Sequence, residues 1–252
     1  RQMKLDGKKK KDFPKDTLAI YWIDKDSTSK HPNVKSFKVA EEGDWIAYLS
    51  TKDLRPKGGK GKKKKKKKKK KKGVEPVKTS GHTLFLRNPV SGKMKKLHRV
   101  TTYSFNRTGT MLAYVTSKKG EKDSSSVRII NLADFKITTL IEDQLSVKKV
   151  AFDYNGDQLS FLTSMDTSDT KNYELQYWKK GMHNSKMVVN ADTKGMPKGW
   201  TVSQHFRVYF SRNGEKIFFG TNEILEEEPE DTLLDEEKAK VDIWHYQDGS
   251  VQ

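Results

Sequence analysis

The sequence lacks cysteine and contains no long apolar run. Without Cys in its 252 residues, the chain has no disulfide, no thiolate metal ligand and no cysteine nucleophile. No apolar stretch approaches the roughly 20 residues that a membrane-spanning helix needs, so we expect no membrane span. The sequence begins with Arg1 and no apolar signal core follows, so we expect any targeting segment to have been removed or to lie outside this sequence.

The positive charge of the chain is also unevenly distributed. The chain has 51 Lys and Arg against 33 Asp and Glu, a net charge of +18, but Lys60 and the lysines at 62–72 carry twelve of those positive charges. Such a tract could act as an electrostatic adaptor for anionic lipid or nucleic acid. It has no interleaved aromatic residues to stack on bases, so we interpret 55–80 as a solvated Lys-rich loop and expect no nucleic-acid partner.

Helical periodicity is scarce, and strand patterns dominate. The best helical candidate is the short stretch 231–240, where Asp231 could cap a turn. Short β-branched or aromatic runs bounded by turn residues predict strands instead, near 18–23, 83–86, 127–130, 173–178 and 207–210. The fold class is therefore expected to be all-β.

One pattern repeats along the chain. Four segments align on a glycine, with apolar residues four positions before it and three and five positions after it: 39–48 on Gly43, 105–114 on Gly109, 152–161 on Gly156 and 210–219 on Gly214. The glycine can adopt the positive φ of a tight turn, and positions three and five after it share one face of a strand. Each segment is therefore predicted to be a β-hairpin with one buried face.

A second pair of strands is expected after each hairpin. Four strands per unit, with 66, 47 and 58 residues between successive glycines, are typical of β-propeller blades. Stretch 18–23 reads as a strand left over from a preceding blade, so we predict about four blades of a larger propeller of seven or eight. The expected organisation is a basic N-terminal segment at 1–17 and a partial propeller at 18–252, with blades near 34–99, 100–142, 147–190 and 202–252.

The hairpin motif resembles TolB-type, WD-like propeller repeats. Stretches 195–202 (GMPKGWTV), 211–221 (SRNGEKIFFGT) and 240–245 (KVDIWH) look like the N-terminal propeller of bacterial prolyl oligopeptidase family (S9-type) serine peptidases. The resemblance implies a C-terminal α/β-hydrolase domain of the same parent chain as partner, with a Ser-Asp-His triad. It also implies a peptide substrate whose access the propeller controls and to whose binding it contributes, and it favours a periplasmic or secreted location.

No catalytic residue is assigned in this chain. It has no Gly-x-Ser-x-Gly motif and no α/β alternation in which to place one, so hydrolase activity would belong to the parent protein. The dipeptidyl-peptidase branch uses paired glutamates in an aromatic context, which 226–228 lacks, so that role is not transferred. The alternative function is a stand-alone TolB-like propeller that acts as a scaffold for a protein or peptide.

No metal or cofactor site is expected either. The acidic stretch 223–237 lacks the alternating ligands and glycine turn of a calcium loop, and 153–157 reads as a hairpin turn because its glycine belongs to the repeat. The histidines show no paired spacing for zinc; they are His31, His82, His98, His183, His205 and His245. The sequon at Asn106 also falls in a repeat turn, and we interpret it as accidental.

Overall fold

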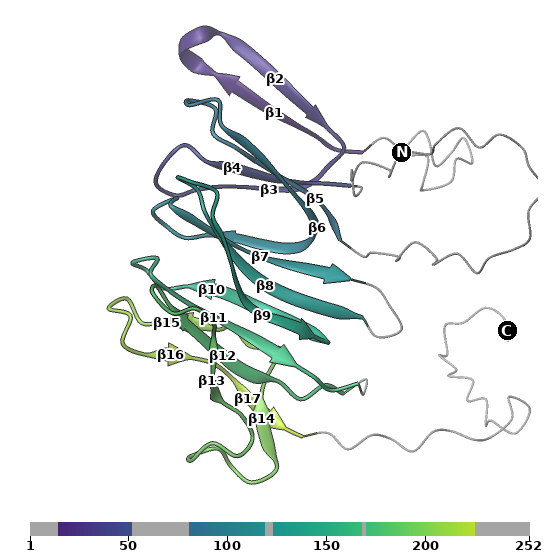
Figure 1. Ribbon diagram of the computed structural model, residues 1–252, viewed down its shortest axis with the longest axis vertical. Coiled ribbons are helices and arrows are strands. Elements are labelled where there is room, and N and C mark those ends of the chain that lie inside the picture. Colours follow the sequence, from purple (N-terminus) through teal and green to yellow (C-terminus); the bar gives the residue numbers. More distant parts are fainter. Residues whose placement is uncertain (1–14, 52–80, 119–122, 168–169, 225–252) are drawn as a thin grey trace, which may run out of the picture.

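The computed structural model describes residues 15–51, 81–118, 123–167 and 170–224. These residues form strands β1 to β17 and one short 3-10 turn, η2 (Ile23–Lys25), so the described chain is all-β, as predicted. The strands stack from β1 and β2 at one end to β14–β17 at the other (Figure 1). Within these ranges no helix is long and apolar enough to cross a membrane.

The largest sheet has seven antiparallel strands in sequence order and spans two blades. It contains β3 (Val34–Val39), β4 (Ile46–Ser50), β5 (His82–Arg87), β6 (Met94–Phe105), β7 (Met111–Lys118), β8 (Ser124–Asn131) and β9 (Ile137–Gln144). The first part of β6 pairs with β5 and the second with β7. Arg99 has a φ of 62°, so β6 changes direction between its two partners. Blade 1 therefore comprises β3, β4, β5 and the first part of β6. Blade 2 comprises the second part of β6 with β7, β8 and β9.

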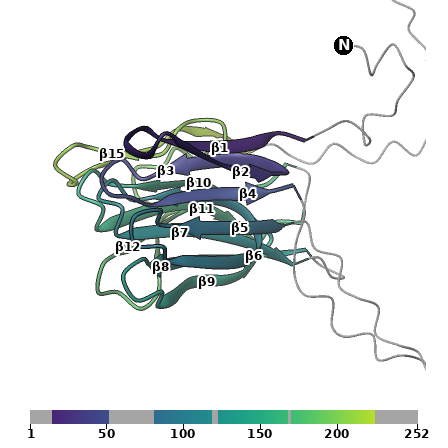
Figure 2. The same cartoon turned by 90° about the horizontal axis from the view of Figure 1, so that it is seen from above.

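The remaining strands form two further blades and a terminal hairpin. Blade 3 is the four-stranded sheet β10 (Ser146–Phe152), β11 (Gln158–Ser164), β12 (Glu174–Lys179) and β13 (Lys186–Val189). Blade 4 consists of two short pairs, β14 (Trp200–Val202) with β17 (Thr221–Glu223), and β15 (Tyr209–Phe210) with β16 (Ile217–Phe218). At the other end, β1 (Thr17–Trp22) pairs with β2 (Ser27–Pro32). In the view of Figure 2, β3, β10 and β15 lie toward one side of the stack and β9 toward the opposite side.

The predicted hairpins are confirmed at all four glycines. Gly43, Gly109, Gly156 and Gly214 have φ values of 96°, 64°, 80° and 73°. In each hairpin the apolar residue four positions before the glycine is the register partner of the one three positions after it; the pairs are Val39–Ile46, Phe105–Leu112, Phe152–Leu159 and Phe210–Ile217. The same turn geometry therefore sets the register of every blade.

The core consists of interfaces between consecutive blades. Leu112 and Tyr114, three and five positions after their glycine, are buried against blade 1. Leu159 and Phe161, at the same positions of the next repeat, are buried against blade 2. The equivalent Ile217 and Phe219 pack on blade 3, and Ile46 and Tyr48 pack on the β1–β2 hairpin. Each blade thus presents the same strand face to its predecessor, so the described residues form a propeller segment rather than a flat sheet.

The glycines are also needed because the hairpin turns of neighbouring blades touch. A Cβ atom built on Gly109 would lie 2.3 Å from the Glu42 carbonyl oxygen, and one built on Gly156 would lie 2.7 Å from Asn106 Nδ2. Real Cβ atoms do not approach other atoms so closely. Contact between blades therefore selects glycine independently of the turn conformation.

Several sequence expectations need adjustment. Strand β2 was not anticipated, because its first five residues are all polar and Pro32 ends it. The strand expected at 207–210 is shorter: only Tyr209 and Phe210 are extended, and Arg207 precedes them as an exposed loop residue. The helix candidate at 231–240, the last expected strand and the lysine tract lie outside the described residues. The ranges given for whole blades remain predictions.

Candidate functional site: the inner wall of the blades

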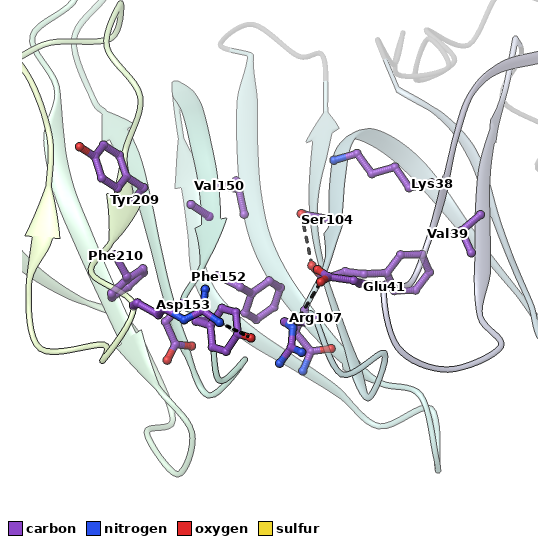
Figure 3. Close-up of a pocket in the computed structure, with 15 residues that line it drawn as sticks. Lys38, Val39, Glu41, Ser104, Arg107, Val150, Phe152, Asp153, Tyr209 and Phe210 are labelled. Atoms are coloured by element: carbon purple, nitrogen blue, oxygen red, sulfur yellow. Dashed lines mark hydrogen bonds and ion pairs between the residues drawn. The ribbon is translucent and has the colours of Figure 1, made fainter.

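The innermost strands of the four blades bring equivalent residues to one cavity. It has a volume of about 670 Å³, and each blade contributes the apolar residue four positions before its glycine: Val39, Phe105, Phe152 and Phe210. Val39 is 55% exposed although it occupies the recurring apolar position of the repeat, whereas the three phenylalanines are half-buried. Figure 3 labels Val39, Phe152 and Phe210 of this set along the wall, together with Lys38, Glu41 and Arg107. The cavity wall is therefore a row of apolar side chains with charged neighbours.

A second row lies two positions before each glycine and crosses all four blades. Glu41, Arg107, Tyr154 and Arg212 occupy these positions. The Glu41 carboxylate accepts from Arg107 Nε at 3.4 Å, and Arg107 also forms an ion pair with Glu42. The guanidinium carbons of Arg107 and Arg212 lie 4.2 and 4.3 Å from the centroid of the Tyr154 ring. We call these four residues the cross-blade row.

The charge of the cross-blade row differs between its two ends. Arg212 Nη2 donates to the Tyr154 hydroxyl at 3.0 Å, so the tyrosine contacts both arginines through its ring and one of them through its oxygen. The carboxylates lie at the blade 1 end, whereas the blade 4 end carries Arg212. Cation–π contacts of this kind orient guanidinium groups without neutralising their charge.

Buried polar residues three positions before the glycine hold the turns in place. Asn106 is 1% exposed and Asp153 is 4% exposed. Asn106 Oδ1 accepts from the main-chain nitrogens of Thr110 and Met111 at 3.0 and 2.9 Å. Asp153 Oδ1 accepts from Gln158 N at 2.8 Å. The side chains that line the cavity are thus carried on turns whose own hydrogen bonds are satisfied.

A second cavity adjoins the first between β10 and the segment leading into β15. It has a volume of about 600 Å³ and is lined by Lys149, Val150, Ala151, Arg207, Val208 and Tyr209. The register of β10 breaks between Lys148 and Ala151, and Lys149 has a φ of 53°. Lys149 Nζ donates to the His205 carbonyl oxygen at 3.4 Å. Two of its lining residues, Lys149 and Arg207, are positively charged, and none is a carboxylate.

Desolvation shifts the pKa values of two residues at the blade 1 part of the wall. Desolvation lowers the pKa of Lys38, and the ammonium lies 5.6 Å from the centroid of the Tyr103 ring. Burial raises the pKa of Tyr103, whose hydroxyl lies 3.2 Å from Ser36 Oγ. Tyr103 therefore stays a neutral phenol at ordinary pH and serves as a polar, uncharged neighbour for Lys38.

The lining residues provide binding groups rather than a nucleophile with its base. Ser104 lines the larger cavity, but its hydroxyl donates to the Phe105 carbonyl oxygen at 3.4 Å, and neither cavity has a histidine in its lining. The two cavities can hold a ligand through apolar, cationic and hydrogen-bonding contacts.

The residues considered for metal binding do not come together in the described ranges. Stretch 153–157 is a hairpin turn in which the Asp153 carboxylate accepts a main-chain hydrogen bond from Gln158. Of the acidic stretch 223–237 the structure describes Glu223, which ends β17, and Ile224. His31 contacts Tyr48 and Arg87, and His98 contacts Thr83. Among the described residues there is no group of three or more metal-ligating side chains.

Sequence reasoning did not single out Arg107, Tyr154, Arg207 or Arg212. Arg107, Tyr154 and Arg212 each lie two positions before the glycine of their repeat. Because this position holds different residue types, the alignment of the repeats did not indicate a shared role. Asn106 was noticed only as a sequon. Its burial and its bond across 3.3 Å to the Gly156 carbonyl oxygen show a structural role.

Comparisons with known proteins support only a distant likeness in fold. No protein-family model and no curated protein matches the chain. Among solved structures, the tricorn protease is 13% identical with a TM-score of 0.47, covering 78% of this chain and 20% of that one. TolB from Acinetobacter baumannii is 14% identical with a TM-score of 0.43, covering 81% and 42%. The β-propeller domain of the Trilobed protease from Pyrococcus furiosus is 10% identical with a TM-score of 0.42, covering 68% and 45%. The chain thus spans less than half of each of these proteins.

Proposed function

We propose that the chain is the non-catalytic propeller portion of a prolyl oligopeptidase family serine peptidase, where it controls access of peptides and contributes to their binding. The observation that carries the proposal is the convergence of equivalent residues from four blades on one inner cavity. The segments at 195–202, 211–221 and 240–245, which resemble propellers of that family, favour the same assignment.

The wall suits an extended peptide. Its half-buried phenylalanines can contact apolar side chains, while Ser104 and the charged cross-blade row can contact polar ones. Strand β10 is paired on one side only within its sheet, so its other edge offers main-chain donors and acceptors to a ligand strand. The lining has no nucleophile–base pair, so hydrolysis would be carried out by a separate domain.

Labelling with a fluorophosphonate serine probe tests the peptidase assignment. The 252-residue chain alone should not react, whereas the natural protein should be labelled at a serine within a Gly-x-Ser-x-Gly motif that follows Gln252 in the reading frame. Labelling at a serine of this chain, or a reading frame without such a motif, would contradict the assignment.

A second candidate is a stand-alone TolB-like propeller that binds a protein or peptide at the same wall. The four aligned hairpins favour it, because they resemble the TolB repeat itself and require no hydrolase. The reading frame separates the two candidates: the scaffold needs no catalytic domain, and peptide binding by the isolated chain should then represent its whole activity.

A further inference from the structure

The cavity between blades 3 and 4 differs from the rest of the inner wall in its charge. Lys149 and Arg207 line it, and no carboxylate does. At the blade 1 end of the wall, by contrast, Glu41 and Glu42 accompany Arg107. Asp153 lines the adjoining cavity, but it is buried and accepts hydrogen bonds from Gln158 N and Nε2 at 2.8 and 3.3 Å. An anion entering this cavity therefore meets positive groups.

The backbone of β10 is distorted where it presents the first cation. Lys149 adopts a φ of 53°, in the left-handed region that non-glycine residues rarely occupy, within the register break between Lys148 and Ala151. The bulge turns the neighbouring lysines to different partners, because Lys148 Nζ donates to Gln204 Oε1 and Lys149 Nζ donates to the His205 carbonyl oxygen. An ammonium has three donors, so Lys149 retains hydrogen-bonding capacity after this contact.

The second cation, Arg207, has its donors available. It is exposed, and within the described ranges its guanidinium takes part in no hydrogen bond or ion pair. A guanidinium presents paired N–H groups in a plane that match a carboxylate. Tyr209 borders the same cavity and is 53% exposed, with its ring stacked on Phe218 at 5.1 Å.

We propose that Lys149 and Arg207 form a carboxylate-binding subsite, so that the wall between blades 3 and 4 binds peptides bearing an acidic side chain or a free C-terminus. The inference rests on the peptide-binding part of the proposed function and adds the chemistry of the peptide. The open edge of β10 beside Val150 and Ala151 can pair with the peptide main chain while its carboxylate reaches the two cations. A nucleic acid suits the cavity less well, because the one aromatic ring there already stacks on Phe218.

Calorimetric titration of the whole chain with short N-acetylated peptides tests the subsite. Three peptides share one apolar sequence: one has a Glu side chain and a C-terminal amide, one has Gln and a free C-terminal carboxylate, and one has Gln and an amide. The two carboxylate peptides distinguish the two sources of the anion. The variants are Arg207→Gln and, as a matched control, Lys136→Gln, which removes an exposed charge from the turn before β9. Thermal unfolding verifies that both variants are folded.

We expect at least one carboxylate peptide to bind roughly tenfold more tightly than the uncharged one, as a charge-assisted hydrogen bond at a partly solvated site allows. Arg207→Gln should remove this preference and Lys136→Gln should keep it. Equal binding of all three peptides would overturn the carboxylate subsite and leave peptide binding intact, whereas no binding of any peptide would overturn both. A preference that survives Arg207→Gln, or equal displacement of the peptide by a single-stranded oligonucleotide, would assign the effect to other cations such as the lysine tract and contradict the proposal.

Discussion

Asn106 Nδ2 donates to the Gly156 carbonyl oxygen across 3.3 Å and so joins the hairpin turns of blades 2 and 3. Gln158 Nε2 makes the corresponding bond to the Gly214 carbonyl oxygen at 3.0 Å between blades 3 and 4. In both cases the carbonyl oxygen of a turn glycine accepts from a side chain of the preceding blade's hairpin. The glycines therefore couple the geometry of a hairpin to the assembly of the blades.

Replacing Asn106 by Ala should destabilise the chain. The substitution leaves the main-chain nitrogens of Thr110 and Met111 without their acceptor, and the unsatisfied buried Met111 nitrogen alone should cost about 1–3 kcal/mol. Chemical denaturation measures the change. Asn88→Ala is the matched control, because Asn88 accepts from Val90 N and Ser91 N in a solvent-exposed turn. Equal losses in the two variants would contradict a special role of Asn106 between blades.

Gly156→Ala should cost more than Gly92→Ala. Both glycines have a positive φ, 80° and 72°, so the conformational penalty of about 1 kcal/mol is shared. Only the Cβ at position 156 would meet another residue, Asn106 Nδ2 at 2.7 Å, whereas nothing lies within 4 Å of one at position 92. The difference in unfolding free energy measures the contact between blades. Identical values would show that the turn alone selects glycine.

Stability should decrease as the pH falls through the titration of His31. Its pKa is lowered by desolvation and by the positive charge of Arg87, whose Nη1 lies 3.3 Å from His31 Nε2. The unfolded chain therefore binds the proton more readily than the folded one, so this contribution is complete above the ordinary pKa of 6.5 and is lost as the pH falls through the lower folded value. The free energy of unfolding, measured for the wild type and for His31→Gln between pH 8 and pH 5, isolates the contribution of His31. The same pH dependence of the unfolding free energy in both proteins would contradict the role of His31.

Tyr154 should contribute to stability through its ring more than through its hydroxyl. Tyr154→Leu removes the contacts to Arg107 and Arg212 and should cost about 1 kcal/mol, in the range of partly exposed cation–π pairs. Tyr154→Phe retains the ring and loses only the acceptor for Arg212 Nη2, so its loss should be smaller. A double-mutant cycle with Arg107→Gln measures the coupling directly. No coupling energy would mean that the two side chains are merely adjacent.

The sequence predicted the hairpins because glycine and the flanking apolar residues report on local turn geometry and strand alternation. Those signals also identified the face of Leu112 and Tyr114, or of Leu159 and Phe161, that is buried between blades. The sequence did not predict strand β2, because its residues show no strand pattern of their own. They are extended because they pair with β1.

The inner wall could not be predicted in the same way. Arg107, Tyr154 and Arg212 come together only because three turns, separated in sequence, stack at equivalent positions. Lys149 and Arg207 line one cavity because of a bulge in β10 and an irregular segment before β15. Such placements depend on the contacts between blades, and no spacing within one segment encodes them.

Hydrogen exchange with and without a bound peptide most directly tests the claim that the inner wall is the binding surface. The 252-residue chain, followed by mass spectrometry at a saturating concentration of an acidic peptide, should show slower exchange in segments 104–107, 149–154 and 207–212. Exchange in the outer strands β9 and β13 should be unchanged. Protection confined to those outer strands, or no protection in any inner segment when calorimetry shows the peptide to be bound, would contradict the account.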